Sequence, residues 1–184
     1  DGDDVHPALR RALDGERPPP PARVMVVANL PYSVGTVMTA RLLTRAAPPD
    51  ALVLMLQSEV VERLRARPGT ADYGPLAILT ALAARVELLR KVPPDVFLPR
   101  PRVESAVVRL TPLPAGEREA SIAQVADLVA LGFRQRRKTL RANLADVATP
   151  DVLAAAGLDG GARPEAVDPA GWARLARALA AGAH

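Results

Sequence analysis

The sequence predicts an α/β domain followed by a small all-helical domain, and three observations support this prediction. Continuous apolar runs alternate with amphipathic stretches up to about residue 110, a pattern typical of strands and helices that alternate along a chain. Residues 111–116 contain two prolines and a glycine, which mark the best domain boundary. Beyond this boundary the apolar spacing is helical. We therefore predict domains at residues 1–112 and 113–184.

The elements expected in the first half follow from their composition. Residues 1–22 are polar and include four consecutive prolines near their end, so we expect a short helix near residues 7–13 and then a surface loop. Residues 24–28 are a continuous apolar run, which predicts a buried strand, and residues 51–56 are a second one, which predicts a parallel strand covered on both faces. Residues 33–46 have apolar side chains at helical spacing, which predicts a helix between the two strands.

The later elements are predicted in the same way. Ser58 can cap a helix that runs to about residue 66, and residues 76–84 predict another helix. Two strands are expected at residues 85–92 and 103–110, joined by a connection with four prolines that cannot be helical and should be exposed. In the second domain the expected helices lie at residues 122–133, 136–147, 150–156 and 169–181.

Composition excludes several classes of protein. Hydrophobic residues make up 49% of the chain, so it is not a disordered sequence, and no apolar run approaches the roughly 18 residues that cross a membrane. The chain contains no cysteine, which argues against disulfides and thiolate metal sites. It contains only two histidines, His6 and His184, one near each end, which argues against a histidine-rich metal site and a Ser-His-Asp triad. We expect a monomeric, cytoplasmic protein without a membrane segment or a bound metal.

Positive charge gathers in one stretch, although the net charge of the chain is a modest +4. Residues 134–141 contain five cations and no acidic residue. On a helix, Arg134, Arg137, Lys138 and Arg141 would share one face through spacings of three, four and seven residues. Because arginine matches the geometry of phosphate, we predict that this face contacts RNA, and the alternative is a solvated helix face. The five cations are Arg134, Arg136, Arg137, Lys138 and Arg141.

The sequence Asn29-Leu30-Pro31-Tyr32 follows the first predicted strand, at the end of a sheet where open α/β folds bind their ligands. Asn29 offers a donor and an acceptor, which can pair with an amino group on a planar base. Pro31 lacks an N–H and biases Leu30 toward an extended backbone, which leaves nearby carbonyls free. Tyr32 supplies a flat face for stacking. The alternative is a strand end followed by a turn and a packing tyrosine.

Taken together, five segments resemble the small-subunit (16S) ribosomal RNA adenine dimethyltransferase family. The resemblance runs from about residue 24 to the end of the chain. It implies the C-terminal part of a Rossmann-like class I methyltransferase sheet, followed by a small all-α domain that helps to place the ribosomal substrate. The segments are residues 29–32, 57–64, 73–76, 92–110 and 133–141.

The resemblance assigns roles to the residues that match the family's catalytic motif. It implies that the Asn29 side chain and the carbonyl that follows it, in the motif with Leu30 and Pro31, accept hydrogen bonds from the N6 amino group of an adenine. Tyr32 and Phe97 would stack on the two faces of the flipped-out base. Asn29 would also lie beside the methyl donor, S-adenosylmethionine.

Two further cations lie next to Phe97 in the sequence. Arg100 and Arg102 flank Pro101 in the proline-rich connection. We predict that they guide the RNA backbone toward the site, and the alternative is that they serve solubility alone.

The implied activity is dimethylation of two adjacent adenines near the 3′ end of 16S rRNA, in a precursor of the small ribosomal subunit. Members of the family bind S-adenosylmethionine through a glycine-rich loop near their N-terminus, and no Gly-x-Gly occurs in this sequence. We therefore expect an N-terminally truncated form that lacks the first strands and most of the cofactor site. Two alternatives remain open: a 23S rRNA adenine methyltransferase of the macrolide-resistance type, and a non-catalytic module for rRNA binding or ribosome assembly.

Overall fold

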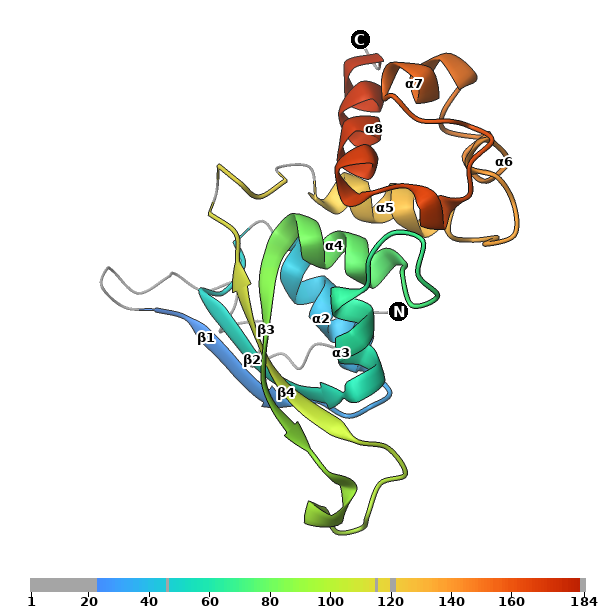
Figure 1. Ribbon diagram of the computed structural model, residues 1–184. Coiled ribbons are helices and arrows are strands. Elements are labelled where there is room, and N and C mark those ends of the chain that lie inside the picture. The colour runs from blue at the N-terminus through green and yellow to red at the C-terminus, as the bar shows by residue number, and fades with distance from the viewer. Residues whose placement is uncertain (1–22, 46, 115, 120–121, 183–184) are drawn as a thin grey trace.

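A four-stranded sheet carries helices on one face, and a second group of helices lies beyond one end of these helices (Figure 1). The computed structural model describes residues 23–45, 47–114, 116–119 and 122–182. The helix expected near residues 7–13 and the proline run lie outside the described residues. The α/β architecture predicted from the alternation of apolar runs is confirmed.

The sheet places the ends of three strands side by side. Its order is β1-β2-β4-β3, with β1 parallel to β2 and the other two pairings antiparallel. Ser105, the first residue of β4, lies opposite Gln57 at the end of β2 and Val92 at the end of β3. The chain that joins β3 to β4 therefore starts and ends at the same edge of the sheet as the carboxyl end of β1. The strands are β1 (Met25–Asn29), β2 (Ala51–Gln57), β3 (Ala84–Val92) and β4 (Ser105–Pro112).

One face of the sheet is covered by the helices α2 (Gly35–Thr44), α3 (Ser58–Arg65) and α4 (Pro75–Ala83) (Figure 1). Burial in β2 alternates, because every second residue faces these helices, so the prediction that the described residues cover residues 51–56 on both faces was wrong. The prediction that residues 24–28 form a buried strand was wrong on this point. Met25 is 53% exposed and Val27 is 74% exposed, since the described helices pack against the opposite face of β1.

The C-terminal part of the chain is helical, as predicted, and packs around a tryptophan. Trp172 is fully buried, and the centre of its ring lies 5.9 Å from that of Phe133. Gly132 makes this packing possible, because a Cβ at that position would overlap the indole ring. The elements are α5 (Ile122–Gly132), α6 (Leu140–Asn143), α7 (Pro150–Ala155), the 3-10 turn η2 (Pro164–Ala166) and α8 (Pro169–Gly182).

The predicted helix over residues 136–147 was wrong. Helix α5 ends at Gly132, the chain then turns, and α6 spans Leu140–Asn143 alone. The Thr139 hydroxyl caps α6 by accepting a hydrogen bond from the Ala142 backbone N–H. The Asn143 side chain donates to the carbonyls of residues 135 and 138 and fixes the loop in its bent form. These hydrogen bonds compete with a continuous helix, and a helix would also bring like charges together.

The chain between α3 and α4 joins the sheet half to the helical half. The Gly69 N–H donates to the Glu165 carbonyl over 2.9 Å, and the Tyr73 hydroxyl donates to the Val167 carbonyl over 2.8 Å. A continuous set of buried apolar side chains runs from the strands to α8. The two halves are therefore packed against each other, and the division at residues 112 and 113 stays a prediction. Within the described residues, no helix is long and apolar enough to span a membrane.

Candidate functional site

The residues Asn29-Leu30-Pro31-Tyr32 turn the chain from β1 directly into α2. The Leu30 N–H donates to the Met55 carbonyl and keeps this residue beside β2. The Pro31 carbonyl accepts hydrogen bonds from the N–H groups of Val34 and Gly35, each over 3.1 Å, so the turn leads into the first turn of α2. Among the described residues, no hydrogen bond occupies the Leu30 carbonyl or the Asn29 carboxamide. These two polar groups are therefore available to a ligand.

A close approach between α2 and β2 holds this turn in place. Gly35, the first residue of α2, is buried, and a Cβ on it would lie 3.1 Å from a methyl group of Leu56. The absence of a side chain lets the helix begin immediately after the motif. The position of Asn29 relative to the sheet is therefore set by backbone packing on both sides of the motif.

A pocket of about 310 Å³ opens beside the motif, close to the lower limit of roughly 300 Å³ for small-molecule sites. The proline-rich connection between β3 and β4 also lines this pocket. Its Phe97 lies 65 residues after Tyr32 in the sequence. Part of that connection is the short 3-10 turn η1 (Pro94–Val96), so the expectation of a wholly non-helical segment needs that correction. The pocket is lined by Asn29, Leu30, Pro31, Tyr32, Phe97, Pro99 and Pro101.

A buried serine fixes the tyrosine of the motif. The Tyr32 hydroxyl and the Ser105 hydroxyl are 2.8 Å apart, and Ser105 is fully buried at the start of β4. Tyr32 itself is 39% exposed, so its ring remains accessible on the pocket side. Sequence reasoning missed Ser105, and the signal that could have found it is a polar residue at the start of an otherwise apolar strand.

The second wall of the pocket is tied to the sheet through Glu104. The Ser58 N–H donates to the Glu104 carbonyl over 2.9 Å, and the Ser58 hydroxyl donates to the Glu104 carboxylate over 3.1 Å. The ammonium group of Lys91 lies 3.6 Å from the same carboxylate. The connection between β3 and β4 carries Phe97. Glu104 thus anchors the end of this connection to α3 through Ser58 and to β3 through Lys91. Sequence reasoning did not single out these contacts either.

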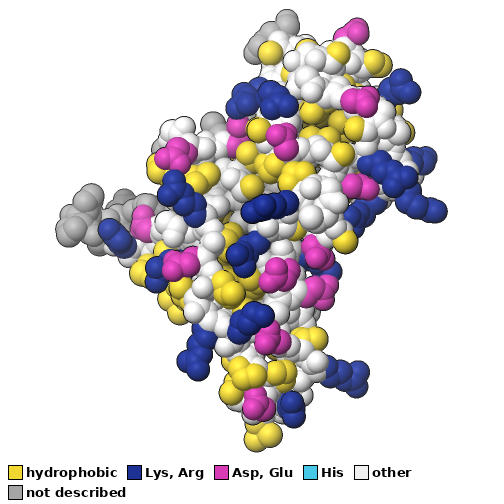
Figure 2. Space-filling view, in the orientation of Figure 1, with side chains coloured by type: hydrophobic (Ala, Val, Ile, Leu, Met, Phe, Trp, Pro, Cys, Tyr) yellow, Lys and Arg dark blue, Asp and Glu magenta, His cyan; other side chains and the backbone are white. Residues whose placement is uncertain are grey.

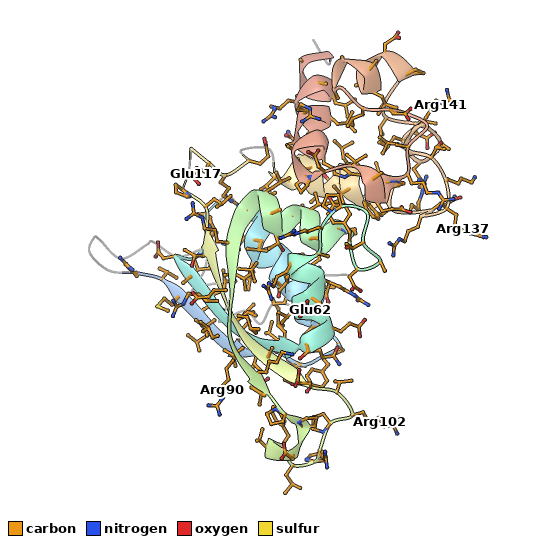
Figure 3. All side chains as sticks on the ribbon, in the orientation of Figure 1. Glu62, Arg90, Arg102, Glu117, Arg137 and Arg141 are labelled. Carbon is orange, nitrogen blue, oxygen red and sulfur yellow. The ribbon has the colours of Figure 1, made fainter. Side chains whose placement is uncertain are left out.

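The pocket combines aromatic faces with neutral hydrogen-bond acceptors. Such a site suits a flat ring that carries an amino group. Within the described part of the chain, no cluster of His, Asp or Glu side chains could hold a metal ion. Arg100 and Arg102 are exposed, and Figure 3 shows Arg102 pointing away from the sheet. They border the pocket in sequence but do not line it.

The basic cluster forms a loop surface rather than the predicted helix face. All five cations are exposed, and the chain around them bends between α5 and α6. Figure 2 shows cationic side chains gathered on this side of the helical half, and Figure 3 labels Arg137 and Arg141 on the same side, at separate places along the chain. The Arg136 guanidinium donates to the carbonyls of Ala71 and Tyr73 over 3.2 and 3.4 Å, which ties the loop to the sheet half.

Comparison with known proteins identifies related sequences. A family model described as "Ribosomal RNA adenine dimethylase" matches residues 14–181. A protein of Roseobacter denitrificans named "Ribosomal RNA small subunit methyltransferase A" is 46% identical over 168 residues, which cover 88% of this chain and 59% of that protein. The chain thus spans less than two thirds of the length of this curated relative.

Two solved structures resemble the fold. A dimethyladenosine transferase from Plasmodium falciparum aligns with a TM-score of 0.70 at 22% identity, covering 91% of this chain and 74% of that protein. The 23S rRNA methyltransferase ErmE aligns with a TM-score of 0.54 at 27% identity, covering 94% of this chain and 77% of that protein. The Plasmodium falciparum protein is only 22% identical, so its likeness shows a shared fold alone. This fold is of the Rossmann-like methyltransferase type.

Proposed function

The chain belongs to the ribosomal RNA adenine dimethylase family, and we propose that it acts in the N6,N6-dimethylation of two adjacent adenines near the 3′ end of small-subunit rRNA. The observation that carries this proposal is the pocket in which residues 29–32 meet Phe97. The name of the Roseobacter relative supports the small subunit as the substrate. The proposed partner is a precursor of that subunit.

In this proposal the pocket binds one adenine that has left its base stack. The Asn29 carboxamide oxygen and the Leu30 carbonyl accept hydrogen bonds from the N6 amino group, because both are available in the folded chain. Tyr32 and Phe97 hold the two faces of the base. Stacking on an aromatic side chain contributes about 1–3 kcal/mol per base, while flipping a base out of a helix costs a few kcal/mol. Two rings can therefore offset most of the cost of flipping.

The same hydrogen bonds prepare the amino nitrogen for methylation. Two acceptors in fixed positions orient the N–H bonds, so that the nitrogen lone pair points out of the plane of the base. The rate then depends on positioning and on electron density at nitrogen rather than on a strong general base. This agrees with the described residues that line the pocket, since none of them is a histidine, aspartate or glutamate.

We infer that S-adenosylmethionine is the methyl donor, since the family is named for methyl transfer to adenine. The residues described fit the acceptor better than the donor. Asn29 is at the end of β1, where a donor could approach, but the sequence contains no Gly-x-Gly turn to hold a nucleotide-like cofactor. The contributions of this chain that the structure supports are therefore binding and orientation of the adenine.

A methyl-transfer assay tests the proposal. The protein is incubated with labelled S-adenosylmethionine and small subunits whose target adenines are unmodified. The proposal predicts dimethyladenine at the two adjacent positions and loss of product with Asn29→Ala, while RNA binding by that variant is retained. Absence of transfer and of S-adenosylmethionine binding by calorimetry, with salt-dependent RNA affinity retained, would instead support a non-catalytic rRNA-binding module.

A second candidate function is methylation of 23S rRNA, which the structural likeness to ErmE favours. The two candidates predict opposite preferences for RNA. We propose the small subunit, so a stem-loop from the 3′ end of 16S rRNA should compete for binding more strongly than a 23S rRNA fragment of equal length. The reverse preference would favour the second candidate.

A further inference from the structure

The connection between β3 and β4 presents two different rows of side chains. Phe97, Pro99 and Pro101 line the pocket. The residues between them do not line it: Leu98 is 100% exposed, and Arg100 is exposed as well. The inner row therefore belongs to the proposed adenine site, and the outer row is presented to whatever surrounds that site.

Full exposure of Leu98 is unusual, because burying a leucine side chain gains about 1.5–3 kcal/mol. Val96, on the other side of Phe97, is 63% exposed. These two side chains, called the apolar tip below, belong to the loop after β3, which projects from the molecule at the far end of the sheet (Figure 1). Neither side chain of the tip belongs to the buried core, so folding does not require them to be apolar.

The neighbours of the tip indicate the chemistry of a partner. Arg100 and Arg102 follow Leu98 at every second residue and are both exposed. An apolar side chain followed by two guanidinium groups matches a nucleic-acid strand, in which bases offer apolar faces and phosphates offer negative charge. With an adenine held against Phe97, the next residue, Leu98, would face the strand that carries this adenine.

We propose that Leu98 is a wedge that packs against the RNA base next to the flipped adenine and fills the space that the adenine vacates. Proteins that distort nucleic acids use leucine and other apolar side chains between base steps in this way. The inference rests on the proposed function, since it requires an adenine in the pocket. It adds a contact with the neighbouring nucleotide, whereas the proposed function assigns the pocket-lining residues to the adenine itself.

A binding cycle tests this contact. The dissociation constant is measured for the chain and for Leu98→Ala, each with two RNAs: the 3′ stem-loop of 16S rRNA and the same stem-loop with an abasic nucleotide beside the target adenines. Because Leu98 is fully exposed, its truncation removes no packing within the protein. Val147→Ala is the matched control, because it truncates a 40% exposed apolar side chain in the helical half.

The wedge predicts a loss of affinity that depends on the neighbouring base. Leu98→Ala should weaken binding to the intact stem-loop by about fivefold or more, the low end of the effect of losing a base contact. With the abasic RNA the same substitution should change affinity by less than about twofold, because the partner base is gone. Val147→Ala should leave both constants unchanged.

Two different results separate failure of the wedge from failure of the proposed function. Equal effects of Leu98→Ala on both RNAs, or no effect on either, would overturn the wedge. Tyr32→Ala serves as the check on the pocket. If the unmodified chain fails to bind the stem-loop, or Tyr32→Ala binds it as tightly as the unmodified chain, the proposed adenine site itself is contradicted.

Discussion

At the scale of single residues, the hydrogen bond between Tyr32 and Ser105 connects the proposed base-binding ring to the sheet. The two hydroxyl groups are 2.8 Å apart, and Ser105 is fully buried where β4 begins. Without this contact the Tyr32 ring could adopt other rotamers, because 39% of the residue is exposed. Ser105 therefore restrains the orientation in which the ring faces the pocket.

The first prediction concerns this hydrogen bond. Ser105→Ala and Tyr32→Phe should each lower the free energy of unfolding by about 1 kcal/mol, the usual net worth of one hydrogen bond. The double variant should be as stable as the less stable of the two single variants, within a few tenths of a kcal/mol, because both changes remove the same contact. Urea denaturation measures all three variants. Fully additive effects would show that the two hydroxyl groups act independently.

The residues that line the pocket could be predicted from the sequence better than the residues that hold them in place. Asn29 to Tyr32 stand at the end of an apolar run, and the fold constrains such a position to an edge where ligands bind. Phe97 lies in a segment whose prolines exclude it from a strand. Ser105 carries only the weak signal of a polar residue at the start of an apolar strand. Its partner lies 73 positions away and is brought to it only when the sheet assembles.

At the scale of elements, the loop between α5 and α6 differs most from expectation. Sequence spacing alone favoured a helix, but Thr139 and Asn143 satisfy backbone groups locally and stop it. Such side-chain contacts depend on where the chain bends, so periodicity cannot reveal them. The cations are all exposed, but on a bent loop rather than along one face of a helix.

The second prediction tests this surface as an RNA contact. Replacing Arg137 and Lys138 together with alanine should reduce the slope of log affinity against log salt by about 1.4 to 1.8, as expected for two lost phosphate contacts. Replacing Arg85 and Arg109, which lie on the sheet and pair with acidic residues, removes the same formal charge and should leave the slope unchanged. The measurement is binding of the rRNA stem-loop at a series of salt concentrations. Equal slopes for both double variants would mean that net charge, not this loop, sets the affinity.

The third prediction concerns the packing of α5 against α8. Gly132→Ala places a methyl group against the buried Trp172 ring. One ring atom would overlap this methyl group, and a second ring atom would lie 3.0 Å from it. Overpacking of this kind lowers stability by about 1–3 kcal/mol. Thermal unfolding followed by circular dichroism should show a lower Tm, whereas Gly116→Ala, with no atom within 4 Å, should not change it. An unchanged Tm for Gly132→Ala would refute the tight contact.

At the scale of the whole molecule, the sheet half and the helical half share one set of buried side chains. Tyr73 is the clearest link, since it is 1% exposed and its hydroxyl donates to the Val167 carbonyl. Burial, aided by the Asp168 carboxylate, raises the pKa of Tyr73 well above its ordinary value of 10.0. The sequence could predict that a second, helical unit follows the sheet. It could not predict that a tyrosine after α3 would join them, because that contact spans 94 positions.

The fourth prediction is a pH dependence that follows from this raised pKa. In the unfolded chain Tyr73 loses its proton near pH 10, whereas in the folded chain it stays neutral to higher pH. Its contribution to stability is therefore complete below pH 10 and declines as the pH rises above that value. Tyr73→Phe should be less stable by about 1 kcal/mol at pH 8, and its stability should fall less steeply between pH 10 and 11. Urea denaturation at each pH measures both proteins, and parallel pH profiles would contradict the assignment.

The central claim is that an adenine of ribosomal RNA enters the pocket between Tyr32 and Phe97, and photocrosslinking tests it most directly. A 16S rRNA 3′ stem-loop with 8-azidoadenine at the target positions is irradiated with the chain, and the modified residues are identified by mass spectrometry. The account predicts labelling of Tyr32 or Phe97, competed by unmodified stem-loop and lost at the pocket with Tyr32→Ala. Labelling confined to residues 134–141, with residues 29–32 and 97 unmodified, would contradict it.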